Sequence, residues 1–482
     1  MSLRRALCLF LCLVGGLGAA DLAGKIQRVL DSATGLRRGF LGLQIVNLGT
    51  GDVLFESNAD HLFVPASNSK LFTTALGLTR LGPDYRFHTT VVASSAPDAD
   101  GRIAGAVTLV GDGDPNLSGR ELPYRVDSPR GDGLRAIEEL AGQIAARGVR
   151  RIDGDIVGDD SAYLWEPYPD GWGLGDALWE YGAPVSALTI NDNAFVLNLY
   201  PGDPARISID PPLEFYQIEN LVEAGSPKNI KIGRESGSRE LRIWGTLPPN
   251  DPGLSELLAV DDPALYAAVA LRDALERRGV AIRGSAIARH WLPGKPVEPT
   301  SGVELARQDS APLVEDLRVT AKVSQNLHAE LILRAVARAR RGEGNRQAGI
   351  EEMRVFLKEA GVPASEYVLD DGSGLSRKSL VTPGAVVKLL RFMYRSPQRE
   401  NWLSILPVGG EDGTLRLRLR GTPAAGRIHA KTGSLTHVTA LSGYAERKDG
   451  TMLAFSFLAN NQSAPAGEVR AALDKICVLM TE

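Results

Sequence analysis

Both ends of the chain carry a pair of strand-like runs, and this constrains the fold more than any other feature. Near the start, Phe40–Val46 and Val53–Glu56 flank the turn Asn47-Leu-Gly-Thr-Gly51, a pattern typical of a β-hairpin. Near the end, Thr439–Glu446 and Met452–Leu458 flank a Lys-Asp-Gly turn. The second pair is apolar almost throughout, which suits strands covered on both faces. We therefore expect one sheet built from both chain ends.

Three further segments have the apolar spacing of helices. They are Ala23–Ala33, Glu468–Leu479, and Ser67–Leu81, which follows Pro65. In Ser67–Leu81, apolar residues recur every three or four positions, as they do on one face of a helix. We expect these helices to flank the sheet.

The segment from about Arg86 to Leu247 has a different pattern. Short strand-like runs alternate with turn sequences rich in Gly, Pro, Asn and Asp. The runs are Thr89–Ala93, Ile103–Val110, Ile152–Val157, Ala194–Tyr200, Ile207–Ile209 and Leu241–Thr246. Helical spacing occurs in Gly133–Arg147 and Asp262–Gly279. We infer a β-rich insertion that divides the domain containing both termini.

Charge and motif content exclude several classes of protein. Lys and Arg number 54 against 58 Asp and Glu, a formal charge of −4, so the chain lacks the positive charge that nucleic-acid backbones attract. The motifs Gly-x-Ser-x-Gly, His-Glu-x-x-His and Gly-x-Gly-x-x-Gly are missing, as is a complete phosphate loop. The six His residues have no ligand spacing, so we expect no metal and no cofactor.

Two local patterns have simple structural interpretations. The segment Asp112–Asn116 opens like a calcium loop, but Leu117 and Pro123 stand where Gly and Glu are needed, so we interpret it as a turn. Leu415–Arg420 alternates Leu and Arg. This alternation predicts a strand with its Arg face in solvent rather than an anion site.

The first twenty residues predict an export signal that is cleaved after Ala20. Arg4 and Arg5 precede the apolar run Ala6–Ala20, which ends in small residues and is short for a membrane span. Loss of both Arg leaves 52 − 58 = −6 for the mature chain. Two of the three cysteines leave with the signal, so we expect Cys477 alone and no internal disulfide. No later apolar run reaches about 18 residues, so we expect no membrane span.

Three short motifs carry the chemistry. Ser67-Asn-Ser-Lys70 is the only Ser-x-x-Lys, Ser324-Gln-Asn326 the only Ser-x-Asn, and Lys431-Thr-Gly433 the only Lys-Thr-Gly. A Ser and a Lys at i and i+3 of a helix share one face, so their side chains can hydrogen-bond. The first motif is weak alone, because a capping Ser also explains it. Together and in this order, the three are the set used by penicillin-interacting serine enzymes.

On these motifs the chain resembles the low-molecular-mass class C penicillin-binding proteins, the D-alanyl-D-alanine carboxypeptidase/endopeptidase family of bacterial cell-wall enzymes. The resemblance extends to Leu109–Pro115, Asp371–Arg377 and Gly410–Leu415. It also extends to the gap of 324 − 67 = 257 residues between the first two motifs. Simple β-lactamases have a far shorter gap, which the class C type fills with extra domains.

The resemblance implies a fold and a domain plan. The fold is an α/β (α+β) penicillin-recognising serine transpeptidase/β-lactamase-like fold, in which helices flank an antiparallel sheet and a β-rich two-domain insertion divides the chain. The expected parts are the signal peptide (1–20), the catalytic domain (21–90 and 311–482), inserted domain II (91–110 and 186–310) and inserted domain III (111–185).

The resemblance also implies roles for the catalytic residues. Ser67 would attack the carbonyl between two D-Ala residues and form an acyl-enzyme. Lys70 is the nearest candidate base, and burial together with the charge of Lys431 would lower its pKa enough to accept the proton. Ser324 would relay the proton to the leaving amine, and Asn326 would orient Lys70 and the substrate amide.

The substrate-binding residues follow from the same resemblance. Lys431, Thr432 and Ser434 would hold the terminal carboxylate. The backbone N–H groups of Ser67 and Ser434 would form the oxyanion hole. The expected partners are peptidoglycan stem peptides as substrates and β-lactam antibiotics as covalent inhibitors, and the location is the periplasm.

A diaminopimelate side chain in the substrate would need a cation and an acceptor. Arg377, and Asp160 or its neighbour Asp159, are the candidates, with a structural salt bridge or a turn cap as the alternative for each. Glu351, Glu352 and Glu359 lie on a helix-like stretch and are interpreted as exposed helix charges rather than as a deacylating base.

Several alternatives stay open. A β-lactamase would differ by rapid turnover of the acyl-Ser67 intermediate, and a non-catalytic wall-binding or antibiotic-sensing module would not turn over at all. The sequence does not fix the balance of carboxypeptidase and endopeptidase activity. It does not fix the oligomeric state either, so a homodimer is as open as a monomer.

Overall fold

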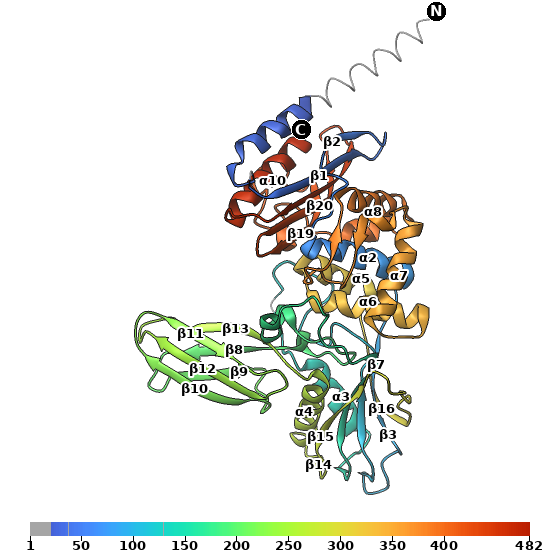
Figure 1. Cartoon of the computed structure of the whole chain (residues 1–482). Helices are drawn as coiled ribbons and strands as arrows, with labels where there is room; N and C mark the ends of the chain where they lie inside the picture. The colour runs from blue at the N-terminus through green and yellow to red at the C-terminus, as the bar shows by residue number, and fades with distance from the viewer. Residues whose placement is uncertain (1–20, 37, 129) are drawn as a thin grey trace, which may run out of the picture. The chain divides into compact units, whose positions relative to one another are not determined.

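The computed structural model describes residues 21–36, 38–128 and 130–482, which form two compact units (Figure 1). The terminal unit contains the described residues up to Arg80, with Leu317–Asn326 and Ile350–Glu482. The middle unit contains Leu81–Asp316 and Leu327–Gly349. The predicted signal peptide lies outside the described residues. The division of the insertion into domains II and III stays a prediction.

A five-stranded antiparallel sheet forms the centre of the terminal unit. Its order is β19-β20-β21-β1-β2, so three strands from the C-terminal end of the chain lie beside two strands from the N-terminal end, joined by the β21–β1 pairing. The strands are β1 (Phe40–Asn47), β2 (Val53–Ser57), β19 (Ile428–Leu435), β20 (Val438–Glu446) and β21 (Met452–Asn460). The sheet that the two hairpin patterns predict is therefore confirmed.

Helices cover both faces of this sheet (Figure 1). On one face, strand residues such as Leu43 and Phe455 pack with Ile26 of the helix over residues 21–32 and with Ile476 of α10 (Ala466–Met480). On the other face lies α8 (Pro383–Arg395), and the hydroxyl of Tyr444 on β20 donates to the Leu390 carbonyl of α8 at 2.7 Å.

The remaining elements of the terminal unit are short. They are η1 (Thr34–Leu36), η2 (Ala66–Asn68), α2 (Ser69–Arg80), the π-helical turn η6 (Val319–Val323), η7 (Ala364–Glu366), β17 (Tyr367–Val368), β18 (Leu380–Val381), α9 (Arg399–Ile405) and η8 (Gly413–Leu415). Three helices cross a boundary between the units along the sequence: α5 (Leu313–Arg318), α6 (Asn326–Arg341) and α7 (Arg346–Glu359).

The middle unit contains four sheets, with orders β15-β7-β5-β3-β16, β14-β6-β4, β13-β8-β9 and β10-β12-β11. The strands are β3 (His88–Ala93), β4 (Arg102–Ile103), β5 (Val107–Val110), β6 (Arg151–Ile152), β7 (Ile156–Leu164), β8 (Ala194–Tyr200), β9 (Arg206–Asp210), β10 (Gln217–Ala224), β11 (Asn229–Gly233), β12 (Glu240–Leu247), β13 (Leu254–Ala259), β14 (Ala281–Ile282), β15 (Ala286–Trp291) and β16 (Val303–Asp309). Its other helices are α3 (Arg135–Ala146), η3 (Leu174–Leu178), η4 (Glu180–Gly182), η5 (Asn191–Asn193) and α4 (Pro263–Glu276). Buried residues of α3 and α4 join the strands in one core.

The strand predicted at Leu415–Arg420 is wrong. The chain forms the turn η8 there and continues in turns, with a left-handed Leu419 (φ 64°). Leu415 and Leu419 are buried, and Arg418 pairs with Asp474 at 2.6 Å rather than facing solvent. A strand places side chains two residues apart on one side, whereas these turns place side chains four residues apart on one side. A Leu-Arg alternation fits both patterns, so it does not distinguish a strand from turns.

The interpretation of Glu352 as an exposed helix charge is also wrong. Its side chain is only 8% exposed and accepts a hydrogen bond from Arg80 Nε at 2.8 Å. The Arg80 guanidinium also pairs with Glu359 and lies 5.7 Å from the centre of the Phe356 ring. The C-terminal end of α2 is thus held against α7 by a partly buried ion pair.

Candidate active site

Ser67 lies in the tight turn η2, immediately before α2. The sequence predicts a helix from Ser67, but the α-helix begins at Ser69 and Ser67 belongs to a 3₁₀ turn, a common variant at helix N-termini. Ala66 has a left-handed backbone (φ 48°), which costs a residue with a Cβ of order 1–2 kcal/mol. The turn leaves the Ser67 side chain half-buried, whereas the side chain of Lys70 is fully buried.

The Lys70 amine contacts three uncharged acceptors. Its Nζ lies 3.0 Å from Ser67 Oγ, 2.6 Å from Asn326 Oδ1 and 2.8 Å from the Ser373 carbonyl. Three acceptors match the three protons of an ammonium. A neutral amine would keep two of these contacts as a donor and accept the Ser67 hydroxyl proton through its lone pair. The geometry therefore suits proton transfer between Ser67 and Lys70.

Ser324 lies between the π-helical turn η6 and α6. Its backbone is left-handed (φ 68°), which is uncommon for a residue with a side chain. Asn326 begins α6 and reaches Lys70. This irregular junction therefore sets the positions of both polar side chains of the Ser-x-Asn motif. Backbone strain of this kind is concentrated at functional sites.

Lys431 extends from β19 to Ser324. Its Nζ donates to Ser324 Oγ at 2.8 Å and to the Thr432 carbonyl at 2.9 Å. Its side chain is fully buried, and burial together with the nearby charge of Lys70 holds the pKa of Lys431 well below its ordinary value. The lowered pKa that the sequence predicts for Lys70 stays a prediction.

The β19 strand connects the third motif to the first. The Asn68 side-chain amide donates to the Lys431 carbonyl at 3.1 Å. Gly433 also lies against the serine turn, because a Cβ there would be 2.9 Å from the Pro65 carbonyl. β19 is an edge strand of the sheet, and Thr432 and Ser434 alternate with the buried Lys431 and Gly433. The accessible side of β19 therefore presents Thr432 and Ser434 beside the serine turn.

A loop for which we predicted no catalytic role supplies a further contact to Lys70. Buried Asp371 accepts hydrogen bonds from Ser373 Oγ, the Gly374 N–H and the Ser376 N–H at 2.9–3.1 Å. These bonds hold the loop so that the Ser373 carbonyl reaches Lys70. Gly374 has φ 78°, and a Cβ there would lie 1.9 Å from the Ala66 carbonyl, so glycine alone fits. The resemblance at Asp371–Arg377 pointed to this loop, but neither it nor the Asp-Gly-Ser-Gly turn pattern identified the contact with Lys70.

The segment Gly410–Leu415, which is part of the family resemblance but had no predicted contact, connects the second and third motifs. The Thr432 hydroxyl donates to Thr414 Oγ1 at 2.8 Å. Lys322, in η6 just before Ser324, donates to Asp412 Oδ2 at 2.5 Å and to the Leu406 carbonyl at 2.8 Å. These bonds connect the 412–414 segment to both β19 and η6.

Seven of the predicted residues lie at the motif site of the terminal unit. Six of them form two hydrogen-bonded groups, Ser67–Lys70–Asn326 and Ser324–Lys431–Thr432, and Ser434 is exposed on the same strand as Lys431. Arg377 is exposed in the same unit and donates to the Thr436 carbonyl at 2.8 Å. Asp160 lies in the middle unit and is buried; it accepts from Ser186 at 2.8 Å and contacts His290 at 2.9 Å. Its role in substrate binding stays a prediction.

The family model described as D-Ala-D-Ala carboxypeptidase 3 (S13) matches residues 22–478. The chain belongs to this family. This S13 family chain is 34% identical to the D-alanyl-D-alanine carboxypeptidase of Actinomadura sp. (strain R39) over 484 residues, which cover 97% of this chain and 86% of that protein.

The fold is also that of known relatives. The structure is similar to that of penicillin binding protein 4 (dacB) from Haemophilus influenzae, with a TM-score of 0.80 and 25% identity, covering 93% of this chain and 97% of that chain. A structure of the same H. influenzae protein complexed with a novel β-lactam has a TM-score of 0.76 at 24% identity, with the same coverage. The penicillin-recognising fold that the sequence predicts is confirmed, and S13 membership supports D-Ala-D-Ala carboxypeptidase function.

Two further observations concern metal ions and membranes. Among residues 21–36, 38–128 and 130–482, no group of three or more His, Cys, Asp and Glu side chains is arranged to hold a metal ion. Within the same described part of the chain, no helix is both long and apolar enough to cross a membrane.

Proposed function

We propose that this S13 family protein is a serine-type D-Ala-D-Ala carboxypeptidase that acts on peptidoglycan stem peptides through an acyl-Ser67 intermediate. The observation that carries the proposal is the 3.0 Å contact between Lys70 Nζ and Ser67 Oγ, beside the contacts of the same amine with Asn326 Oδ1 and the Ser373 carbonyl. An alcohol needs a base before it can attack an amide, and a buried amine that is held by uncharged acceptors can serve as one.

In the acylation step, Ser67 Oγ forms a bond to the carbonyl carbon of the penultimate D-Ala while its proton passes to Lys70 Nζ. The C–N bond to the terminal D-Ala then breaks. The leaving amine needs one proton, which Ser324 supplies from its hydroxyl, and the proton that Lys70 took from Ser67 then passes to Ser324. Contacts of Lys431 with Ser324 and of Lys70 with Asn326 support this arrangement.

Substrate binding in this proposal uses the edge strand β19. An extended peptide can add to an edge strand through backbone hydrogen bonds. Thr432 and Ser434 lie on its accessible side, and Lys431 supplies a cation for the terminal carboxylate. The N–H groups of Ser67 and Ser434 would stabilise the oxyanion. Removal of one such donor commonly raises the barrier by about 2.7–4 kcal/mol.

Release of the acyl group requires a water molecule, whose OH adds to the acyl carbon while Ser67 regains its proton. β-Lactams would acylate Ser67 in the same way and leave slowly, as the β-lactam complex described for the H. influenzae relative suggests. We extend the proposal to endopeptidase action on D-Ala-diaminopimelate cross-links, with Arg377 and Asp160 as candidate partners of the diaminopimelate end. The predicted export signal and the cell-wall substrate are consistent with a periplasmic location.

The proposal is tested with purified mature protein and muropeptides of defined structure. Pentapeptide and cross-linked muropeptides are incubated with wild-type protein, Ser67→Ala and the control Ser463→Ala, an exposed serine of the same unit. Mass spectrometry should show loss of one D-Ala with wild type and Ser463→Ala, and none with Ser67→Ala. Release of D-Ala by Ser67→Ala would contradict the assignment. Rapid hydrolysis of penicillin by wild type would favour a β-lactamase instead.

A further inference from the structure

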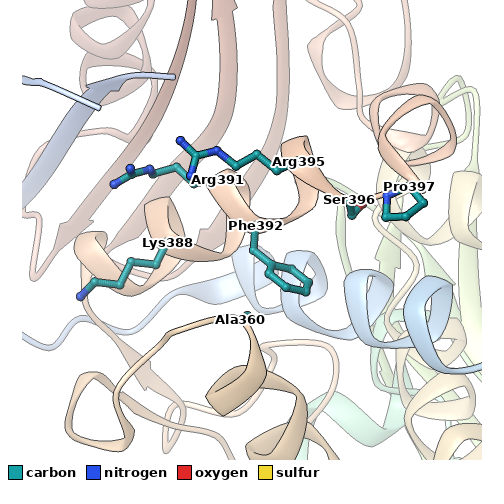
Figure 2. A pocket seen from close by; sticks show the side chains of 7 residues that line it. All are labelled: Ala360, Lys388, Arg391, Phe392, Arg395, Ser396 and Pro397. Carbon is teal, nitrogen blue, oxygen red and sulfur yellow. The ribbon is translucent and has the colours of Figure 1, made fainter. Parts of the chain in front are cut away.

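A pocket of about 460 Å³ lies on the solvent side of α8 in the terminal unit (Figure 2). Lys388, Arg391, Phe392 and Arg395 line it from positions i, i+3, i+4 and i+7 of α8, so they share one helix face. The other lining residues are Ala360, Ser396 and Pro397. None of the seven belongs to the motif site described above.

The pocket concentrates positive charge in a chain whose net charge is −4. Lys388 is paired with Glu366. In contrast, the structure records no hydrogen bond or ion pair for Arg391 or Arg395 with any described residue. Figure 2 shows these two side chains extending in the same direction from α8. Two guanidinium groups are thus left without counter-charges on one side of a pocket.

The helix dipole explains only part of this arrangement. Cations in the last turn of a helix gain about 0.3–1 kcal/mol from the dipole, and this accounts for Arg395 at the end of α8. The effect falls off within one turn, so it does not account for Lys388 or Arg391. The next arginine, Arg399, behaves differently, because it donates to the Tyr394 hydroxyl at 2.7 Å and stacks on that ring.

The rest of the lining is apolar. Phe392 points toward Ala360 (Figure 2). Its ring contacts that of Phe356 edge to face, with ring centres 5.8 Å apart. Pro397 adds a further apolar surface. The hydroxyl of Ser396 already donates to the Met393 carbonyl at 2.8 Å. Recognition of a ligand therefore falls to the two free guanidinium groups, with Phe392 beside them for an apolar or ring portion.

We propose that this pocket binds a phosphate monoester or pyrophosphate group, carried on a small organic body, on the α8 face of the terminal unit. Arginine forks bind phosphate through paired hydrogen bonds. Two unpaired guanidinium charges match a phosphate that carries close to two negative charges, whereas a single carboxylate would neutralise only one of them. The inference does not depend on the proposed peptidase function, because it uses none of the same residues.

Binding of inorganic pyrophosphate to the whole mature protein tests the proposal by isothermal titration calorimetry in 150 mM NaCl, which screens unspecific surface attraction. We expect saturable binding, at least tenfold weaker in Arg391→Ala/Arg395→Ala and unchanged in Arg470→Ala. Arg470 is a matched control because it is an exposed arginine of the same unit in α10. The variant Arg391→Lys/Arg395→Lys keeps the charges and loses the forks, so its affinity should fall between the two.

Binding measurements with two further ligands identify the source of the phosphate group. Glycerol 3-phosphate represents a soluble ester, and phosphatidylcholine vesicles with one-fifth phosphatidic acid represent a lipid headgroup. Binding of either one that is lost in the double alanine variant supports the proposal. Absence of saturable pyrophosphate binding, equal binding by all variants, or equally tight binding of succinate would overturn it. Penicillin acylation should be the same in all variants, which shows that they are folded.

Discussion

The motif site of the terminal unit and the middle unit surround their charged groups differently. In the motif site, Lys70 and Lys431 are fully buried and contact hydroxyl, amide and carbonyl oxygens. In the middle unit, the buried Arg334 faces Glu330 at 3.0 Å and the half-buried His290 faces Asp160 at 2.9 Å. A buried cation with a carboxylate is fixed in its charged state, whereas one with neutral partners can lose its proton. The contrast separates a reactive pair of amines from structural ion pairs.

The largest expected effect concerns Lys70, one of the two buried lysines of the motif site. Lys70→Ala should lower the rate of acylation by a penicillin by about 10²–10⁴-fold, because general base catalysis commonly contributes about that much. Stopped-flow measurement with a fluorescent penicillin gives this rate. The matched control is Lys475→Ala on α10, which should acylate at the wild-type rate. A fall of less than tenfold in Lys70→Ala would show that another group activates Ser67.

A pair of isosteric replacements compares the two kinds of buried cation directly. Arg334→Met should lower the free energy of unfolding by about 3–5 kcal/mol, because Glu330 then stays buried without its ion pair. Lys431→Met should not destabilise the protein and should instead raise its melting temperature, because no buried carboxylate loses a partner. It should nevertheless abolish acylation. Thermal melts followed by circular dichroism measure the stability of both variants. Equal destabilisation by Arg334→Met and Lys431→Met would show that the two kinds of buried cation do not differ.

The ion pair of His290 makes the middle unit sensitive to alkaline pH. Burial alone would lower the pKa of His290, but hydrogen bonds to Asp160 and Asp262 raise it to about 10. A raised folded-state pKa stabilises the protein fully below about pH 6.5, and this stability is lost as the pH rises through 10. Burial raises the pKa of Asp160 too, which reduces the net gain, so we expect a loss of about 2 kcal/mol.

Melting temperatures between pH 6 and pH 10.5 test this dependence. His290→Gln should melt lower than wild type at pH 6, and the difference should shrink as the pH rises. A constant difference across this range would mean that His290 is not charged in the folded protein.

The smallest expected effect on stability concerns Asp114, which is an acid, whereas His290 is a base. Burial raises the pKa of Asp114 to about 6, although the Asn116 N–H favours the carboxylate. The folded state therefore binds a proton more tightly than the unfolded state, so stability falls as the pH rises from about 4 to about 6. Asp114→Asn should melt about 2–4 °C higher than wild type at pH 7 and no higher at pH 3. Higher stability of the variant at pH 3 as well would exclude this explanation.

The sequence predicted those parts of the molecule that are encoded locally. The Ser67–Lys70 contact follows from helical spacing, and the central sheet follows from two hairpin patterns. The contacts of Lys70 with Asn326 and of Lys431 with Ser324 join distant segments, so only resemblance to a family could predict them.

Other parts were beyond sequence reasoning for physical reasons. The Ser373 carbonyl is a backbone atom that any residue type would supply, so no motif identifies it. The strand predicted at Leu415–Arg420 was wrong because the chain forms turns there. These turns contain a left-handed Leu419 and an ion pair of Arg418 with Asp474. Burial of Glu352 depends on Arg80, which lies on a different helix.

The most direct test of the account is the site of the covalent adduct. Mature protein is incubated with penicillin, digested, and analysed by tandem mass spectrometry. We expect one adduct, on Ser67, in wild type, and none in Ser67→Ala. An adduct on another residue, or a persistent adduct in Ser67→Ala, would contradict it.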